Sequence, residues 1–459
     1  MVSQKRARQM RVQNSVWQRK ENWRIVMIVT KPRGGLWLDL KKSPASERPI
    51  GEPRFVQRFY LPLRQCRGVL PTITVSQGEH VFMGEPIAQT ADGISCSLHS
   101  PVSGLIESIS EYDHPLGGKS LMLVINNDGQ DAAYKKAGTQ KNTGKLTGEE
   151  IITAVERAGI VATGGLEPPL WVKLRNLSGK KVKAIVINAV ETEPYICSSQ
   201  KLIGENPESV AEGLKLLLQC VGTAKAVVAM SDDIPRDILH GLLETARLAG
   251  VSITAAHIPQ KYPLGNELFL EQEIFSQQDG RHSSAQGETL FVTAQDCANV
   301  SRAVLQGEPQ ISRIITVAGD AVKNPQNLEV RIGTTVRDVL DHCGLAFDPD
   351  RVVLGSPLRG VAVSSLSTPI TKSVEAVLAL KASYGGMGKS ICINCGKCVS
   401  VCPQGLLPNY IAMRAVKADF DALHDLRIER CIECGSCAYI CPGRMPIVEL
   451  IKNIKKAAL

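Results

Sequence analysis

Two copies of one cysteine pattern lie near the C-terminus, and their spacing is typical of iron–sulfur clusters. Both copies read Cys-x2-Cys-x2-Cys-x3-Cys-Pro. The first supplies Cys392, Cys395, Cys398 and Cys402, and the second supplies Cys431, Cys434, Cys437 and Cys441. Three thiolates at this spacing bind three corners of a [4Fe–4S] cubane, and the fourth cysteine reaches the other cluster. We therefore predict one cluster on Cys392, Cys395, Cys398 and Cys441, and a second on Cys402, Cys431, Cys434 and Cys437.

A structural zinc site is the alternative interpretation of these cysteines. Zinc takes four ligands and typically uses two separated Cys-x2-Cys pairs. The doubled eight-cysteine pattern fits two clusters better. Such a module passes one electron at a time, so it needs a donor and an acceptor that the pattern itself does not identify.

The overall composition is that of a folded protein of several domains. The chain has 459 residues, 44% hydrophobic and 21% charged, enough for roughly three domains. Aromatic residues make up only 4%, which argues against stacking on nucleic acid. The formal net charge is +8, and residues 1–20 contain six basic and no acidic side chains. This N-terminal segment is either a solvated tail or a contact with an anionic membrane surface or acidic partner.

The sequence contains no stretch that could span a membrane or serve as a signal-peptide core. We therefore expect a cytoplasmic chain whose membrane association is peripheral. The other six cysteines have no disulfide-like spacing and are expected to be small core residues. They are Cys66, Cys96, Cys197, Cys220, Cys297 and Cys343.

The elements that must position the clusters divide the chain into five predicted parts. Residues 1–50 form the basic N-terminal segment. Residues 51–135 show short β segments with glycine turns, similar to the barrel-sandwich fold of lipoyl carriers, but Gly84–Gly104 contains no lysine to modify. Residues 136–310 alternate apolar strands with helices, which predicts a Rossmann-like α/β domain with a largely parallel sheet. Residues 311–382 are rich in short β segments, and residues 383–459 form the ferredoxin-type module.

The order of these parts, with the motifs INAVETEPYI, KYPLG and VAGDAVKNP, resembles the RnfC subunit of the Rnf (Rsx) electron-transport complex. The resemblance covers about residues 33–446 and implies that residues 311–382 form a soluble-ligand-binding β-grasp domain. It also implies a peripheral subunit on the cytoplasmic face of the inner membrane. Such a subunit binds NADH and FMN and passes electrons through two [4Fe–4S] clusters. Its expected partners are integral membrane subunits and a ferredoxin-type cluster subunit, in a complex that couples electron flow between NADH and ferredoxin to ion translocation.

The flavin segments match this family only in part. The resemblance implies FMN or NADH contacts at Gly164, Gly165, Lys173, Asn188, Glu191, Glu193 and Tyr195. The family loop GLGGAGFPTxxKL reads ATGGLEPPLWVKL here, so Glu167 replaces a glycine. Glycines in such a loop let backbone N–H groups approach a phosphate, and a carboxylate adds negative charge there. We therefore expect weak FMN binding and slow direct NADH oxidation by this chain alone.

Two other functions remain open from the sequence. The chain could be a soluble flavoprotein like cobalamin reductase, which would fractionate without membranes. It could also be a docking or scaffold subunit that has lost its NADH and FMN site and whose clusters are mainly structural. Reduction of the clusters by a physiological donor would separate the scaffold from both electron-transfer functions.

Overall fold

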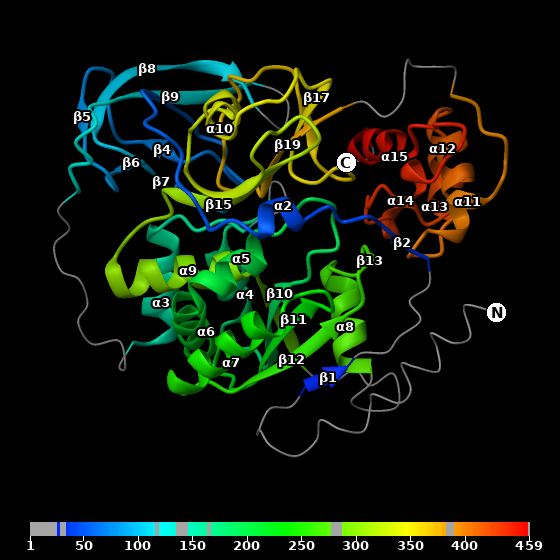
Figure 1. The fold of residues 1–459 in the computed structure, drawn as a ribbon, viewed down its shortest axis with the longest axis horizontal. Helices are drawn as coiled ribbons and strands as arrows, with labels where there is room; N and C mark the ends of the chain where they lie inside the picture. Colours follow the sequence, from blue (N-terminus) through cyan, green and yellow to red (C-terminus); the bar gives the residue numbers. More distant parts are fainter. Residues whose placement is uncertain are drawn as a thin grey trace.

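The computed structural model describes residues 25–27, 34–114, 119–134, 146–162, 167–276, 287–381 and 390–457. In Figure 1 an α/β domain (green) lies below a barrel-sandwich (blue to cyan) and a β-grasp domain (yellow), and a helical module (orange to red) lies at one side. The predicted fold class is therefore confirmed, while the predicted domain boundaries remain predictions.

The α/β domain is built on a five-stranded sheet in the order β1-β12-β11-β10-β14, and every neighbouring pair is parallel. Its strands are β10 (Val182–Ala189), β11 (Ala226–Ser231), β12 (Ile253–Ile258), β14 (Glu288–Val292) and β1 (Ile25–Met27). The apolar runs of the central strands are buried on both faces, as a sheet covered by helices requires. The edge strand β1 was not expected, because its residues were assigned to the N-terminal segment.

Helices cover both faces of this sheet. They are α3 (Gly148–Arg157), α4 (Leu170–Leu177), α5 (Ser198–Glu205), α6 (Pro207–Val221), α7 (Arg236–Leu248), α8 (Glu267–Ser276) and α9 (Ala294–Ser301), which continues as the π-helical η3 (Arg302–Gln306). Helix α6 begins at Pro207, and the Asn206 side chain accepts a hydrogen bond from the Ser209 N–H at 3.2 Å. From the sequence alone, an asparagine followed by proline at these positions predicts a helix start, because the side chain can cap the helix and proline is favoured at its first position.

Two β domains pack above the α/β domain. The barrel-sandwich has sheets β3-β9-β8-β5 and β4-β6-β7. Its strands are β3 (Arg58–Pro62), β4 (Thr72–Ile73), β5 (His80–Val81), β6 (Pro86–Gln89), β7 (Leu98–His99), β8 (Gly104–Asp113) and β9 (Lys119–Asn127). The β-grasp sheet has the order β16-β15-β19-β17-β18 and is crossed by helix α10 (Val336–Cys343). Its strands are β15 (Ser312–Ala318), β16 (Gln326–Arg331), β17 (Arg351–Leu354), β18 (Val361–Val363) and β19 (Ala376–Leu380).

The cysteine motifs lie in a small helical module with its own core of Leu406, Ile411, Leu423, Ile447 and Ile451. Its elements are α11 (Lys397–Ser400), α12 (Pro408–Ala415), α13 (Phe420–Asp425), η4 (Ile428–Arg430), α14 (Ser436–Tyr439) and α15 (Ile447–Ala457). None of the helices in the described ranges is both long and apolar enough to cross a bilayer.

A short ribbon joins this module to the α/β domain. It pairs β2 (Leu36–Trp37) with β13 (Lys261–Tyr262), and the short helix α2 (Ser43–Ser46) follows β2 along the chain. The Gly35 N–H donates to the Val401 carbonyl at 2.8 Å. Gly34 and Gly35 have positive φ, and a Cβ on Gly34 would lie 2.5 Å from the Cys402 carbonyl oxygen. Glycine is therefore needed here for both conformation and close approach.

Candidate functional site

The eight motif cysteines line two separate cavities in the helical module. One cavity is lined by Cys392, Cys395, Cys398 and Cys441, which we call the outer set. The other is lined by Cys402, Cys431, Cys434 and Cys437, which we call the inner set. In each set one cysteine comes from the opposite motif. This grouping supports the predicted exchange of the fourth ligand, and the ligand assignment itself stays a prediction.

The donor chemistry of both sets fits [4Fe–4S] clusters. Each cavity has four thiols and apolar neighbours, with Ala412 and Ile447 in the outer wall and Ile411 and Ile451 in the inner wall. No group of three or more His, Cys, Asp or Glu in the described ranges is arranged to hold a single ion. Four thiolates that bind four different irons of a cubane lie further apart than four ligands of one zinc ion. Bound there, the clusters would accept and release single electrons.

A larger cavity of about 380 Å³ lies at the carboxyl ends of strands β10 and β14. Ligands of open α/β sheets bind in this position, outside the carboxyl ends of the parallel strands. Residues that follow β10 and β14, including Glu191 and Thr293, form one wall. The rest comes from α4, from the loop after β13, from the β-grasp domain and from the cysteine module. We call this the strand-end cavity.

The structure brings together four of the seven residues predicted for FMN or NADH. Lys173, Asn188, Glu191 and Glu193 line the strand-end cavity. Tyr195 is not among its lining residues: its hydroxyl donates to Asp320 at 3.2 Å and lies 3.3 Å from the Lys41 ammonium. The other two, Gly164 and Gly165, lie outside the described residues.

Glu191 is held at the start of helix α5. Its carboxylate accepts hydrogen bonds from the backbone N–H groups of Ser199 at 2.7 Å and Gln200 at 3.4 Å. These bonds and the Lys42 ammonium favour the charged form, but full burial outweighs them and raises the pKa of Glu191 to about 7. Burial therefore favours the neutral form of this carboxyl.

Two further carboxyl groups in the cavity wall, Glu193 and Glu375, lie near Arg359 of the β-grasp domain. Arg359 donates from Nε at 2.9 Å and from an Nη at 2.5 Å to the same oxygen of Glu193. The other Glu193 oxygen is buried and has no hydrogen-bond partner among the described residues. Burial and then the Glu193 charge raise the pKa of Glu375, also in the cavity wall, to about 7. Arg359 is thus paired with Glu193, and the charges of Arg359 and Arg313 partly offset the effect of burial on Glu375.

The described lining of the strand-end cavity carries an excess of negative charge. Its carboxylates are Glu167, Glu191, Glu193, Glu267, Asp296 and Glu375, and its cations are Lys173, Arg313 and Arg359. Fully ionised, six carboxylates against three cations leave an excess of three negative charges, and partial protonation of Glu191 and Glu375, whose pKa burial raises to about 7, lowers this excess near neutral pH. Lys173 is paired with Glu267 at 3.7 Å. The position and size of the cavity fit a flavin ring, whereas this charge does not favour a phosphate.

The strand-end cavity also touches the inner cysteine set. Ile432 and Cys434 line both this cavity and the cavity of the inner set. Tyr262, which is 1% exposed, lines the strand-end cavity and donates its hydroxyl to the Cys434 carbonyl at 2.5 Å. A molecule bound at the strand ends would therefore contact the residue predicted to hold a cluster.

The β-grasp domain adds three charged residues to this wall that were not predicted. Arg313, Arg359 and Glu375 come from the β-grasp domain, far from the flavin motifs in sequence. The glycine turn VLGSPLRG, which ends with Arg359 and Gly360, was the available signal for one of them. Nothing in the local sequence of Arg313 or Glu375 separates them from ordinary residues of short strands.

Four family models match the chain in the order that the sequence predicted. They are described as the RnfC barrel sandwich hybrid domain over residues 30–130, the Nuo51 FMN-binding domain over 155–301, the SLBB domain over 314–362 and the 4Fe-4S dicluster domain over 387–442. The chain therefore contains an FMN-binding-type domain and a dicluster domain.

Comparison with whole proteins gives one consistent family. A chain of the NAD+-reducing [NiFe]-hydrogenase has a TM-score of 0.50 and 16% identity, covering 69% of this chain and 61% of its own length, which shows the fold alone. The RnfC subunit of the Na+-translocating ferredoxin:NAD+ oxidoreductase complex of Acetobacterium woodii is 31% identical, over 83% of this chain and 86% of that protein. The RnfC subunit of the proton-translocating complex of Clostridium ljungdahlii is 33% identical over 84% of each chain. The protein thus belongs to the family of RnfC subunits of ferredoxin:NAD+ oxidoreductase complexes.

Proposed function

We propose that this chain is the peripheral electron-transfer subunit of an Rnf-type complex that couples electron flow between NADH and ferredoxin to ion translocation. Electrons pass between the strand-end cavity and a membrane partner through two [4Fe–4S] clusters. One observation carries this proposal: Ile432 and Cys434 form part of both the strand-end cavity and the inner set. A donor at the strand ends would therefore reach the inner cluster before the outer one.

On this path, electrons leave the chain from the outer cluster to a partner subunit. Cys395 of the outer set is exposed, whereas Cys434 and Cys437 of the inner set are buried. Exposed apolar side chains lie on the two segments that line the outer cavity, and we call them the outer face. They are Ile391 and Ile393 beside Cys392, and Tyr410, Met413 and Val416 on and directly after α12, exposed by 61%, 66%, 45%, 47% and 66%. Apolar patches of this kind mark contact sites for other proteins. We propose that a cluster-bearing or integral membrane subunit of the same complex docks there.

Oxidation of NADH through bound FMN is the step that we expect to be slow in this chain alone. FMN, when bound, would accept the two electrons of a hydride and release them one at a time to the clusters. The described residues that would face it include more carboxylates than cations, and Arg359 is paired with Glu193 while Lys173 is paired with Glu267. This lining supports the expected weak FMN binding, because an anionic phosphate meets uncompensated negative charge. Lys173, Asn188, Glu191 and Glu193 are the proposed contacts.

We further propose that the chain sits on the cytoplasmic face of the membrane and is held there by its partners. Washing membranes with carbonate or high salt should then release it without detergent. Retention until detergent is added would contradict a peripheral attachment.

Cluster reduction tests the proposed function directly. The purified chain, prepared anaerobically, should contain two [4Fe–4S] clusters by iron and sulfide analysis, and both should give EPR signals after reduction. Stopped-flow absorbance should show fast cluster bleaching by a reduced ferredoxin and slow bleaching by NADH alone. If a reduced ferredoxin of lower potential leaves both clusters oxidised, electron transfer by this subunit is wrong.

The acidic lining also favours a second function, a docking subunit without its own NADH and FMN site. In that case electrons would enter the inner cluster from a partner protein. NADH would fail to reduce the clusters even with added FMN, while reduction by the partner would remain intact.

A further inference from the structure

A pair of thiols lies at the junction of three domains, away from both cluster sets. Cys66 and Cys96 belong to the barrel-sandwich and form a buried cluster with Val161 of the α/β domain. Their backbone segments run side by side, because the Val69 N–H donates to the Ile94 carbonyl at 2.8 Å. Within this cluster the two thiols are near enough for each to shift the pKa of the other.

A buried lysine from the β-grasp domain points at this pair. The Lys372 side chain is 0% exposed, and its ammonium lies 3.7 Å from the Cys96 sulfur. Its other acceptors in the described ranges are the carbonyls of Ser97 at 2.9 Å and Gly159 at 2.7 Å. A buried ammonium with two neutral acceptors is stabilised by a nearby anion, and a thiolate on Cys96 provides that anion.

The thiols have different chemical roles in this arrangement. The hydrogen bond from Cys66, followed by the Lys372 ammonium, outweighs burial and lowers the pKa of Cys96 to about 7. The same hydrogen bond and burial raise the pKa of Cys66. A thiolate is the nucleophilic form of cysteine, and a neighbouring thiol can then resolve its oxidised product.

We propose that Cys96 and Cys66 form a reversible dithiol–disulfide pair, with Cys96 as the attacking sulfur and Lys372 as its positioning residue. The oxidant is hydrogen peroxide, which reduced iron–sulfur proteins generate from dioxygen. The pair is 1% and 5% exposed, so a small oxidant can react where a bulky disulfide cannot. Only the source of the peroxide rests on the proposed function; the thiol chemistry does not.

The reaction balances in two steps. The Cys96 thiolate attacks one peroxide oxygen, the S–O bond forms, the O–O bond breaks, and hydroxide leaves and becomes water with the proton given up by the original thiol. Cys96 is then a sulfenic acid, oxidised by two electrons. Cys66 loses its proton and attacks the Cys96 sulfur, so that the S–S bond forms, the S–O bond breaks and a second water leaves.

The pair lies beside the altered flavin loop, which gives the disulfide a consequence. Next to Cys66, the Arg67 N–H donates to the Glu167 carbonyl at 3.2 Å. Next to Cys96, the Ser95 carbonyl accepts from the Trp171 indole N–H at 3.1 Å. Closing the disulfide joins the two segments that hold this end of the loop. The disulfide would therefore link covalently the two segments that contact Glu167 and Trp171.

Peptide mapping of the whole cluster-bearing chain tests the proposal. The chain is treated anaerobically with hydrogen peroxide, trapped in acid with a maleimide, digested and analysed by mass spectrometry. We expect a peptide containing Cys66 disulfide-linked to one containing Cys96, reversible by dithiothreitol. Cys220 is the matched internal control, because its thiol is more exposed and its pKa is raised by burial. Recovery of Cys66 and Cys96 as free thiols after the clusters have bleached would overturn the proposal.

Two variants test the separate roles. In Cys66→Ser, peroxide treatment followed by denaturation in dimedone should reveal a sulfenic acid on Cys96, and its absence would remove Cys96 as the attacking residue. In Lys372→Met, the rate of disulfide formation should fall about tenfold, since the thiolate loses its ammonium. An unchanged rate in a folded Lys372→Met chain would show that the ammonium does not activate the pair. Because these readouts follow thiols, they are independent of FMN binding and of cluster reduction by ferredoxin.

Discussion

Removing the charge of Glu167 should strengthen FMN binding. Among the described residues, Glu167 lines the strand-end cavity together with five further carboxylates and three cations. Because Glu167 is solvent-exposed, its charge acts through a medium close to water. Two unit charges about 4 Å apart then interact by about 1 kcal/mol, and an FMN phosphate carries up to about two charges. Glu167→Gln should therefore make the binding free energy of FMN more favourable by about 1–2 kcal/mol, which lowers the Kd about fivefold to thirtyfold.

Fluorescence titration with FMN and riboflavin separates the effect of the phosphate charge on affinity from the effect of the flavin ring. Riboflavin has no phosphate, so its affinity should change little in Glu167→Gln. The gain for FMN should shrink at about 1 M salt, where exposed charges are screened within about 3 Å. Glu167→Gly serves as the second variant, because it removes the carboxylate and also frees the backbone. If Gly improves FMN binding and Gln does not, backbone conformation rather than charge limits the site.

One result would refute the reasoning as a whole. If the unmodified chain is purified with stoichiometric FMN and NADH bleaches both clusters quickly, the acidic lining does not weaken the site. A matching Kd for FMN in the unmodified chain and in Glu167→Gln would refute the electrostatic argument alone.

Three further predictions concern the clusters, the pH dependence and the outer face. Cys402→Ala should remove the EPR signal of the cluster predicted on the inner set and leave the outer one, and loss of the outer signal alone would contradict the exchange. Since folding raises the pKa of Glu191 and Glu375 to about 7 from about 4.5, each carboxyl stabilises the fold below neutral pH and loses that contribution as pH rises through 7. Thermal unfolding should therefore show a loss of about 1 kcal/mol per carboxyl between pH 6 and 8, and Glu375→Gln should flatten the profile. Val416→Asp should slow electron exchange between the clusters and the membrane partner about tenfold, measured by stopped flow, with unchanged EPR spectra; an unaffected rate would remove the outer face as the docking surface.

Local patterns in the sequence predicted much of this molecule. The apolar runs that became β10, β11, β12 and β14 were long enough to be identified as parallel strands. The start of α6 at Pro207 followed from one capping residue and one proline. These features depend on neighbours within a few positions along the chain.

Contacts between distant segments could not be predicted in the same way. Strand β1 has only three residues, and it is defined by pairing with β12 more than two hundred positions away. Tyr195 sits in a motif that matches the family, yet its positive φ and its contact with Asp320 direct the hydroxyl elsewhere. Arg359 and Glu375 reach the strand-end cavity only because the β-grasp domain packs against the α/β domain.

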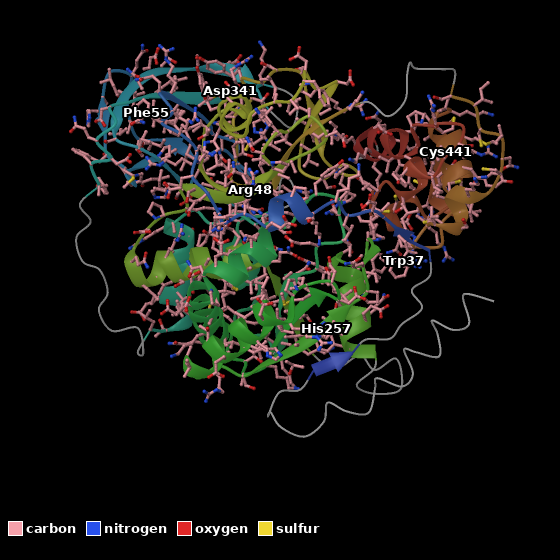
Figure 2. All side chains as sticks on the ribbon, in the orientation of Figure 1. Trp37, Arg48, Phe55, His257, Asp341 and Cys441 are labelled. Carbon is pink, nitrogen blue, oxygen red and sulfur yellow. The ribbon has the colours of Figure 1, made fainter. Side chains whose placement is uncertain are left out.

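The ribbon of β2 and β13 bears on how this protein can change during evolution. The bonds from Gly35 to Val401 and from Tyr262 to Cys434 both end on backbone carbonyls of the cysteine module (Figure 2 labels Trp37 on this ribbon and Cys441 in the module beside it). Electron tunnelling depends steeply on distance, and here the sheet and the cysteine module are joined by the Gly35 N–H and the Tyr262 hydroxyl, neither of which belongs to the flavin loop. Residues of the flavin loop can therefore diverge while the spacing between the sheet and the inner cysteines is inherited unchanged. A lineage that exchanges one electron donor for another can keep the same path from the sheet to the inner and outer cysteine sets.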